Sequence, residues 1–174
     1  LPFSFANAQN NIAGIGISPA TIEGGAIPGE TQVHSMGVTN LSAVPQIYYL
    51  YLRDITGVEP GGVPVFAEEN EVKTGYELTQ WITLDTVELS VNPGEQKQVQ
   101  ITIAVPENAT PGSHFGGVFV SMEPPRLRAT GVAVGYEVAN IISIRVAGDA
   151  VENAQIRSFA TGNFIYGKPI VDFT

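Results

Sequence analysis

The chain has 174 residues, a net charge of −9 and no cysteine, and 44% of its residues are hydrophobic. The absence of cysteine excludes disulfides, zinc–thiolate sites and thiol catalysis. The scarcity of Lys and Arg, 8 in total with no basic window, argues against nucleic acid or an anionic membrane surface as a partner. No apolar run approaches the roughly 18 residues of a transmembrane helix, so no membrane span is predicted.

The chain opens with a leader and an edge strand. Residues 1–8 end in Ala6, Asn7 and Ala8, a small-x-small pattern that predicts the end of a signal peptide, and therefore export, rather than a chance apolar start. Residues 15–19 predict an edge strand, because Pro19 cannot donate to a ladder and ends the pairing.

A weak internal repeat relates the next segments, with an offset of 65 positions from Gly29 to Gly94. Both copies read as a strand, a short connection, a Pro-Gly-Glu turn and a second strand. Pro presets φ in such a turn and Gly takes the positive φ that a type II turn needs. We interpret the copies as two equivalent strand–turn–strand corners of one sandwich. The matched residues are Ile17, Thr21, Ile22, Glu23, Pro28, Gly29 and Glu30 with Ile82, Thr86, Val87, Glu88, Pro93, Gly94 and Glu95.

Three further segments predict strands or a loop. Residues 31–40 form a strand with imperfect alternation around Val33, Met36 and Val38. Residues 46–55 are apolar on both faces, which favours a central strand. Residues 57–76 form one long irregular stretch, which in a compact domain is usually functional.

The second half has the clearest strand patterns. Residues 81–105 predict a strand, a turn at 92–95 and a second strand that alternates apolar and polar. Residues 113–122 predict a strand whose adjacent Gly116 and Gly117 indicate a bulge or a close backbone approach. Residues 132–146 predict one long strand or two collinear ones, paired back as a hairpin. In the strand after 95, one face holds Val99, Ile101, Ile103 and Val105 and the other Gln98, Gln100 and Thr102.

These elements predict an all-β fold, an immunoglobulin-like antiparallel β-sandwich of about seven to nine strands with very little helix. The sandwich spans residues 9–147. Residues 148–174 are expected to be a linker and the first strand of a following, truncated domain. The alternative is an extra strand added to this sandwich or donated to a neighbour, which would allow self-association through the C-terminal strand.

No catalytic or metal-binding constellation is found. His34 and His114 lie on different strands without ligand spacing, so a structural role is preferred over a metal site. Neighbouring strand residues point to opposite faces, so Ser113 and His114 cannot act as nucleophile and base. The chain is therefore predicted to be a non-enzyme without metal or cofactor.

The long stretch at 57–76 is the predicted contact surface. Its ligand-binding candidates are Glu68, Glu69, Glu71 and Tyr76. With Asp54 and Glu59 nearby these carboxylates offer the oxygen ligands that calcium prefers, but no calcium-loop spacing is present and a solvated acidic loop is preferred. Aromatic side chains at Tyr48, Tyr49 and Tyr51 offer a second surface for sugar or protein, although at least half of that set must be core.

A set of short motifs lies within residues 14–147. It comprises Ile17, Ser18, Pro19, Ala20, Ile22, Glu23, a Pro-Gly-Glu turn at 28–30, Val38, Thr39, Asn40, Trp81, Ile82, Leu84, Asn92, Pro93, Gly94, Glu95, Val105, Pro106, Ala109, Pro111, Gly112, His114 and Gly116. The set is similar to the WxL-interacting family of bacterial surface proteins, in particular to their N-terminal peptidoglycan-binding domain. The resemblance implies an exported immunoglobulin-like sandwich attached at a cell wall, followed by a second sandwich and a membrane anchor, of which only a first strand from Gly167 would be present here. Six of the matching residues look like fold-makers rather than ligand contacts: Trp81, Pro93, Gly94, Pro111, Gly112 and His114.

The predicted function is that of a non-catalytic binding module of a bacterial cell-surface protein, recognising cell-wall peptidoglycan or a partner surface protein. One alternative is a structural bead of a stalk or filament. Another is a pilus-chaperone-like subunit binder, which predicts an open groove beside an unpaired sheet edge with a basic residue at its base. Arg53 and Arg145 are the candidates for that residue.

Overall fold

The computed structural model describes residues 14–67, 75–124, 136–150, 159–161 and 171–173. These residues form strands and a single 3₁₀ turn, η1 (Thr79–Trp81), which confirms the predicted all-β class. Over this part of the chain no helix is long and apolar enough to cross a bilayer. The predicted signal peptide, residues 1–8, lies outside the described residues.

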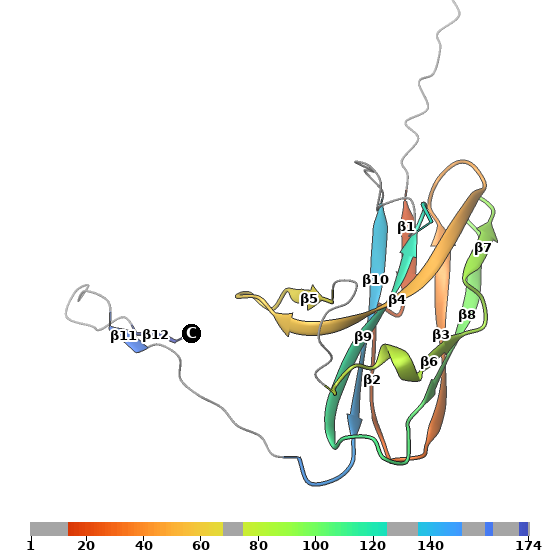
Figure 1. The fold of residues 1–174 in the computed structure, drawn as a ribbon. Coiled ribbons are helices and arrows are strands. Elements are labelled where there is room, and N and C mark those ends of the chain that lie inside the picture. Colours follow the sequence, from red (N-terminus) through yellow and green to blue (C-terminus); the bar gives the residue numbers. More distant parts are fainter. Residues whose placement is uncertain (1–13, 68–74, 125–135, 151–158, 162–170, 174) are drawn as a thin grey trace, which may run out of the picture.

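Two sheets face each other to make the sandwich (Figure 1). In spatial order the four-stranded sheet contains β1 (Ile15–Ser18), β3 (Thr31–Asn40), β8 (Gln96–Ala104) and β6 (Ile82–Leu84). The six-stranded sheet runs β2 (Thr21–Ala26), β10 (Glu137–Val146), β9 (Gly112–Ser121), β4 (Gln46–Val58) and β5 (Pro64–Phe66), with β7 (Glu88–Val91) paired to the other end of β4. The ten strands exceed the expected number because several are short.

Alternate side chains of both sheets meet between the layers and form one core. Val99, Ile101 and Ile103 of β8 are fully buried while Gln98 and Gln100 are exposed, as the alternation predicts. The imperfect alternation of β3 arises at Val33, which is 63% exposed because the inward side chains of β3 are those of even number.

The internal repeat is a repeat of structure. β1 and β6 are the two edges of the four-stranded sheet, and in each copy the chain then crosses to an edge strand of the other sheet, β2 or β7. The single strand predicted before the turn at 92–95 is therefore wrong. Asp85 ends β6 by accepting a hydrogen bond from Gln100 N at 3.0 Å, and the chain resumes as β7 against β4.

The two Pro-Gly-Glu turns match bond for bond. Gly29 N donates to Val105 O at 3.0 Å, and Gly94 N donates to Asn40 O at 2.8 Å. Both glycines have positive φ, 83° and 71°, as the predicted turn chemistry requires. Since Asn40 and Val105 are themselves related by the repeat, each turn closes on the equivalent residue of the other copy. The predicted corners are thus confirmed.

The stretch at 57–76 is more regular than predicted. β4 continues to Val58 and returns as β5 through a turn closed by Glu59 N donating to Val63 O at 2.9 Å. Figure 1 shows this hairpin extending away from the rest of the sandwich. Residues 68–74 of the stretch lie outside the described residues.

The second half of the chain follows the predicted hairpin. β9 and β10 pair antiparallel without a register break, so Gly116 and Gly117 mark a close backbone approach and not a bulge. Residues 125–135, which include the start of the predicted final strand, lie outside the described residues. Towards the C-terminus, β11 (Phe159–Thr161) pairs with β12 (Val171–Phe173). The described part of the tail therefore pairs with itself.

Candidate protein-interaction surface

The outer face of the four-stranded sheet is polar. It carries exposed glutamine and serine side chains that bond to one another: Ser35 Oγ donates to Gln98 Oε1 at 2.8 Å, and Gln96 Nε2 donates to Thr39 Oγ1 at 3.1 Å. Such a face is well solvated and needs no partner.

The outer face of the six-stranded sheet is aromatic. Leu50 and Val118 point into the core, so alternation places Tyr49, Tyr51 and Phe119 on the opposite face. Phe115, on the same side of β9, is 39% exposed. On this side of β9, Gly117 lies between Phe115 and Phe119. Tyr48, the third tyrosine of the predicted aromatic set, is fully buried in the core.

A cluster of rings and one cation lies on this face. Phe119 stacks on Tyr51 at 5.3 Å between ring centroids and meets Phe66 of β5 edge-on at 4.7 Å. The Arg53 guanidinium lies 5.4 Å from the Phe119 ring centre and donates to Ala67 O at 3.2 Å. Phe119 is consequently only 4% exposed although it points away from the core.

Gly117 makes this arrangement possible. A Cβ atom at this position would lie 3.3 Å from Phe66 Cε1 and 3.3 Å from Asn140 O. The bare backbone therefore lets the Phe66 ring lie directly against the sheet. This is the physical reason for the close approach that the paired glycines predict.

Of the predicted ligand-binding residues, Glu68, Glu69 and Glu71 lie outside the described residues, and Tyr76 is the one that can be placed. Its ring is 44% exposed and lies 5.4 Å from that of His114. Asp54, considered for calcium with them, accepts hydrogen bonds from Leu78 N, Thr79 N and Thr79 Oγ1 at 2.6 to 2.9 Å. Its carboxylate therefore caps η1.

The two histidines do not come together. His114 is fully buried on β9, where Nε2 donates to Thr110 O at 2.8 Å and the ring meets Trp81 at 4.3 Å. His34 is half-buried on β3, with Nε2 3.3 Å from Gln32 Oε1. Within the part of the chain that the structure describes, no three potential metal ligands lie together.

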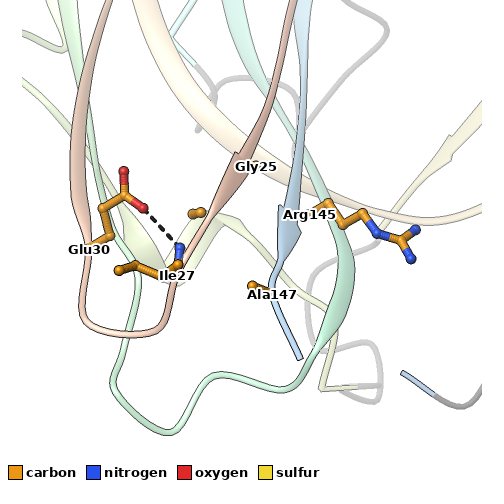
Figure 2. A pocket seen from close by; sticks show the side chains of 6 residues that line it. Gly25, Ile27, Glu30, Arg145 and Ala147 are labelled. Carbon is orange, nitrogen blue, oxygen red and sulfur yellow. Dashed lines mark hydrogen bonds between the residues drawn. The ribbon is translucent and has the colours of Figure 1, made fainter. Parts of the chain in front are cut away.

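A shallow depression of about 370 Å³ lies where β2 ends at the edge of the six-stranded sheet. Gly25 leaves it hollow, and Ile27, Glu30, Arg145 and Ala147 surround it (Figure 2). The chaperone-like alternative predicts such a site with a basic residue at its base. Figure 2 shows the Arg145 guanidinium pointing away from Ile27 and Glu30, so Arg145 supplies its stem to the depression and not its charge.

Two side chains close the backbone edge beside this depression. Glu30 Oε2 accepts from Ile27 N at 2.8 Å, and Gln32 Nε2 donates to Gly25 O at 2.8 Å and to Glu30 Oε1 at 2.9 Å. The sequence interpretation stopped at the Pro-Gly-Glu turn and missed Gln32. Continuing the repeat by two positions would have paired it with Lys97, another long donor side chain.

The acid sensitivity of this edge is a first prediction. Hydrogen bonds from Gln32 and then from Ile27 N–H hold the pKa of Glu30 below its usual 4.5. The ionised carboxylate therefore contributes stability that is present above pH 4.5 and lost as the pH falls through the lower folded value. We expect Glu30→Gln to lower the urea midpoint at about pH 7, and this difference to shrink at about pH 3. An NMR titration that places the Glu30 carboxyl at or above its usual pKa would contradict the prediction.

No family model and no curated protein matches the sequence. Solved structures match its fold. PapD-like domain 7 of human CEP192 aligns with a TM-score of 0.49 and 14% identity over 78% of this chain and 87% of that one. A chain of a chaperone–tip adhesin complex of CFA/I fimbriae aligns with a TM-score of 0.50 and 13% identity, and the class 5 fimbriae chaperone CfaA with 0.49 and 12%. Both alignments cover 91% of this chain and 65% of the other, so this chain spans just under two thirds of their length. At such identities the similarity is one of fold.

Proposed function

We propose that this chain is a non-catalytic binding module that holds a partner protein against its six-stranded sheet. The observation that carries the proposal is the contrast between the two outer faces of one sandwich. Both faces of a two-layer domain are ordinarily solvated. Here the four-stranded face carries glutamine and serine side chains, whereas the six-stranded face presents half-buried tyrosines and the 39% exposed Phe115. Exposed apolar surface of this kind marks interaction sites.

The class of partner is another exported protein. Export, expected from residues 1–8, and a location at the bacterial surface belong to the same proposal. Among the structures that share the fold is a complex whose title names a chaperone and a tip adhesin. That similarity concerns the fold, and the proposal rests on the aromatic face.

Cell-wall glycan, the partner that the family resemblance implies, is the second candidate. The aromatic character of the same face favours it, because Tyr49 and Tyr51 combine an apolar ring with a hydroxyl that can bond to a sugar. The two candidates therefore predict one surface and different ligands.

The test uses short random peptides displayed on phage, with purified peptidoglycan in a parallel sedimentation assay. We expect peptides to be selected. Phe115→Ser should weaken the binding of these peptides by about tenfold, since an aromatic anchor is lost from the interface. Val33→Ser is the matched control, because Val33 is an exposed apolar residue on the opposite outer face. It should leave affinity unchanged.

Two results would overturn the protein-binding proposal. One is that no peptide is selected while peptidoglycan retains the protein and Phe115→Ser abolishes retention, which would establish the glycan candidate. The other is that both substitutions weaken the selected peptides equally, which would mean that the six-stranded face has no special role.

A further inference from the structure

The six-stranded sheet ends in β2 on one side and in β5 and β7 on the other, and among the described residues each of these strands pairs with one strand only. β2 and β7 are the edge strands that the repeat relates. At the β2 edge, outward-pointing backbone groups are occupied by side chains. The carbonyl of Gly25 accepts from Gln32 Nε2, and the N–H of Ile27 donates to Glu30 Oε2, both at 2.8 Å. A carboxylate and an amide thus take the places of the C=O and N–H of a neighbouring strand.

The β7 edge carries the same device in the second copy of the repeat. Asn92 N donates to Glu95 Oε2 at 2.8 Å, and Lys97 Nζ donates to Ser90 O at 2.5 Å. Every one of these four residues corresponds, through the repeat, to one of the four at the β2 edge. Closing the sheet edge with side chains is therefore a property of the repeated unit itself.

The two copies differ in the chemistry of the donor. Lys97 carries a charge and also lies 3.9 Å from Glu95 Oε1. Pairing a strand with β7 would strip water from an ammonium group, and lysine on an edge is a known obstacle to strand addition. Gln32 is neutral. A partner strand can displace its amide by exchanging one neutral hydrogen bond for another.

The β2 edge also has room for a partner's side chain. A Cβ atom at Gly25 would meet one atom within 4 Å, Arg145 O at 3.8 Å, so the space above the backbone is free of side chains. This space is the depression of about 370 Å³, and Ile27 beside it is 62% exposed. A bulky apolar side chain on an adjacent strand fills such a gap well, as aromatic residues do beside edge glycines.

We propose that the partner binds by strand addition at β2, an inference that rests on the proposed protein-binding function. An extended segment of the partner displaces Gln32 and Glu30, so that its N–H groups bond to Gly25 O and its carbonyls bond to the N–H of Ile27. A large apolar side chain of the segment lies in the depression over Gly25. The β7 edge, closed by Lys97, stays free of such a strand.

Opposite substitutions at one position test the inference on the peptides selected above. Gln32→Ala removes the competing cap and should tighten peptide binding by about fivefold, the worth of one hydrogen bond. Gln32→Lys reproduces the β7 closure and should weaken binding by about tenfold or more. If Gln32 only stabilised the fold, both variants would change peptide affinity in the same direction.

Three further variants complete the design. Lys97→Gln and Lys97→Ala, at the equivalent position of β7, are the matched controls and should leave affinity unchanged. Gly25→Lys, at a backbone position with space for a side chain, should weaken binding at least as much as Gln32→Lys does. Hydrogen exchange should show new protection at the amides of Gly25 and Ile27.

The outcomes separate this inference from the function on which it rests. Peptides that depend on Phe115 but not on Gln32 or Gly25 would overturn strand addition and leave protein binding standing. Failure to select any peptide would overturn both. Equal responses at Gln32 and Lys97 would contradict the assignment of the site to β2.

Discussion

Replacing Trp81 with alanine should lower the free energy of unfolding by about 4 kcal/mol, within the usual range for a buried tryptophan. Its indole is 8% exposed and lies 4.3 Å from the buried ring of His114. Trp81 ends the 3₁₀ turn that Asp54 caps, so its side chain also ties that turn to the core. Urea unfolding followed by circular dichroism measures the change.

Tyr76→Ala is the control, because Tyr76 contacts the same histidine from a 44% exposed position. We expect it to cost about 1 kcal/mol, since much of its ring is already in water. A Trp81→Ala effect no larger than that of Tyr76→Ala would show that Trp81 does not anchor this end of the sandwich.

Asn40→Ala should cost about 3 kcal/mol, because it leaves several buried groups without partners. The fully buried Asn40 side chain donates to Val44 O at 2.8 Å and to Val91 O at 3.0 Å. Its Oδ1 accepts from Ser42 N, from Ser42 Oγ and from the Tyr48 hydroxyl at 2.7 to 3.1 Å. One amide therefore joins the end of β3, the following loop, β4 and β7.

Asn108→Ala is the matched control for Asn40→Ala. Both asparagines begin an Asn-x-Ser/Thr triplet, but Asn108 is exposed. Its replacement should change the free energy of unfolding by less than about 0.5 kcal/mol. If the two alanine variants unfold at the same urea concentration, the Asn40 network is not a stabilising unit.

Effects on peptide binding can be separated from effects on folding stability. Gln32, Gly25 and Phe115 lie at exposed or half-buried positions, away from the Asn40 network and from the Trp81 contact. Substitutions at Gly25 and Phe115 should leave the urea midpoint close to that of the parent chain, and those at Gln32 should lower it by no more than Glu30→Gln does, because they break the same Glu30–Gln32 bond. A loss of peptide affinity can then be assigned to the surface and not to unfolding.

The tight turns and the strand with clean alternation could be predicted from the sequence because their physics is local. A Pro-Gly pair restricts φ within two residues, and alternation at Val99, Ile101 and Ile103 requires only that one face of the strand be buried. The repeat was recognisable for the same reason, since each copy carries its own turn. These signals led correctly to an all-β sandwich.

The errors arise where one segment depends on a distant one. The split of the predicted strand into β6 and β7 reflects pairing with β8 and β4, far away in the chain. Phe119 has the pattern of an outward side chain, yet Phe66 of β5 and Arg53 of β4 cover it. No local pattern reports either contact.

The sequence by itself determined the fold class, the two equivalent corners and the absence of any recognisable catalytic motif. The fold class and the corners could be predicted because backbone preferences at a turn and period-two burial along a strand depend only on residues close together in the chain. The tertiary structure alone decided which outer face is aromatic and which side chains close the β2 and β7 edges. Those properties depend on which residues of separate strands become neighbours, as when Gln32 reaches Gly25 and Lys97 reaches Ser90. Such neighbours are chosen by the packing of the whole sandwich.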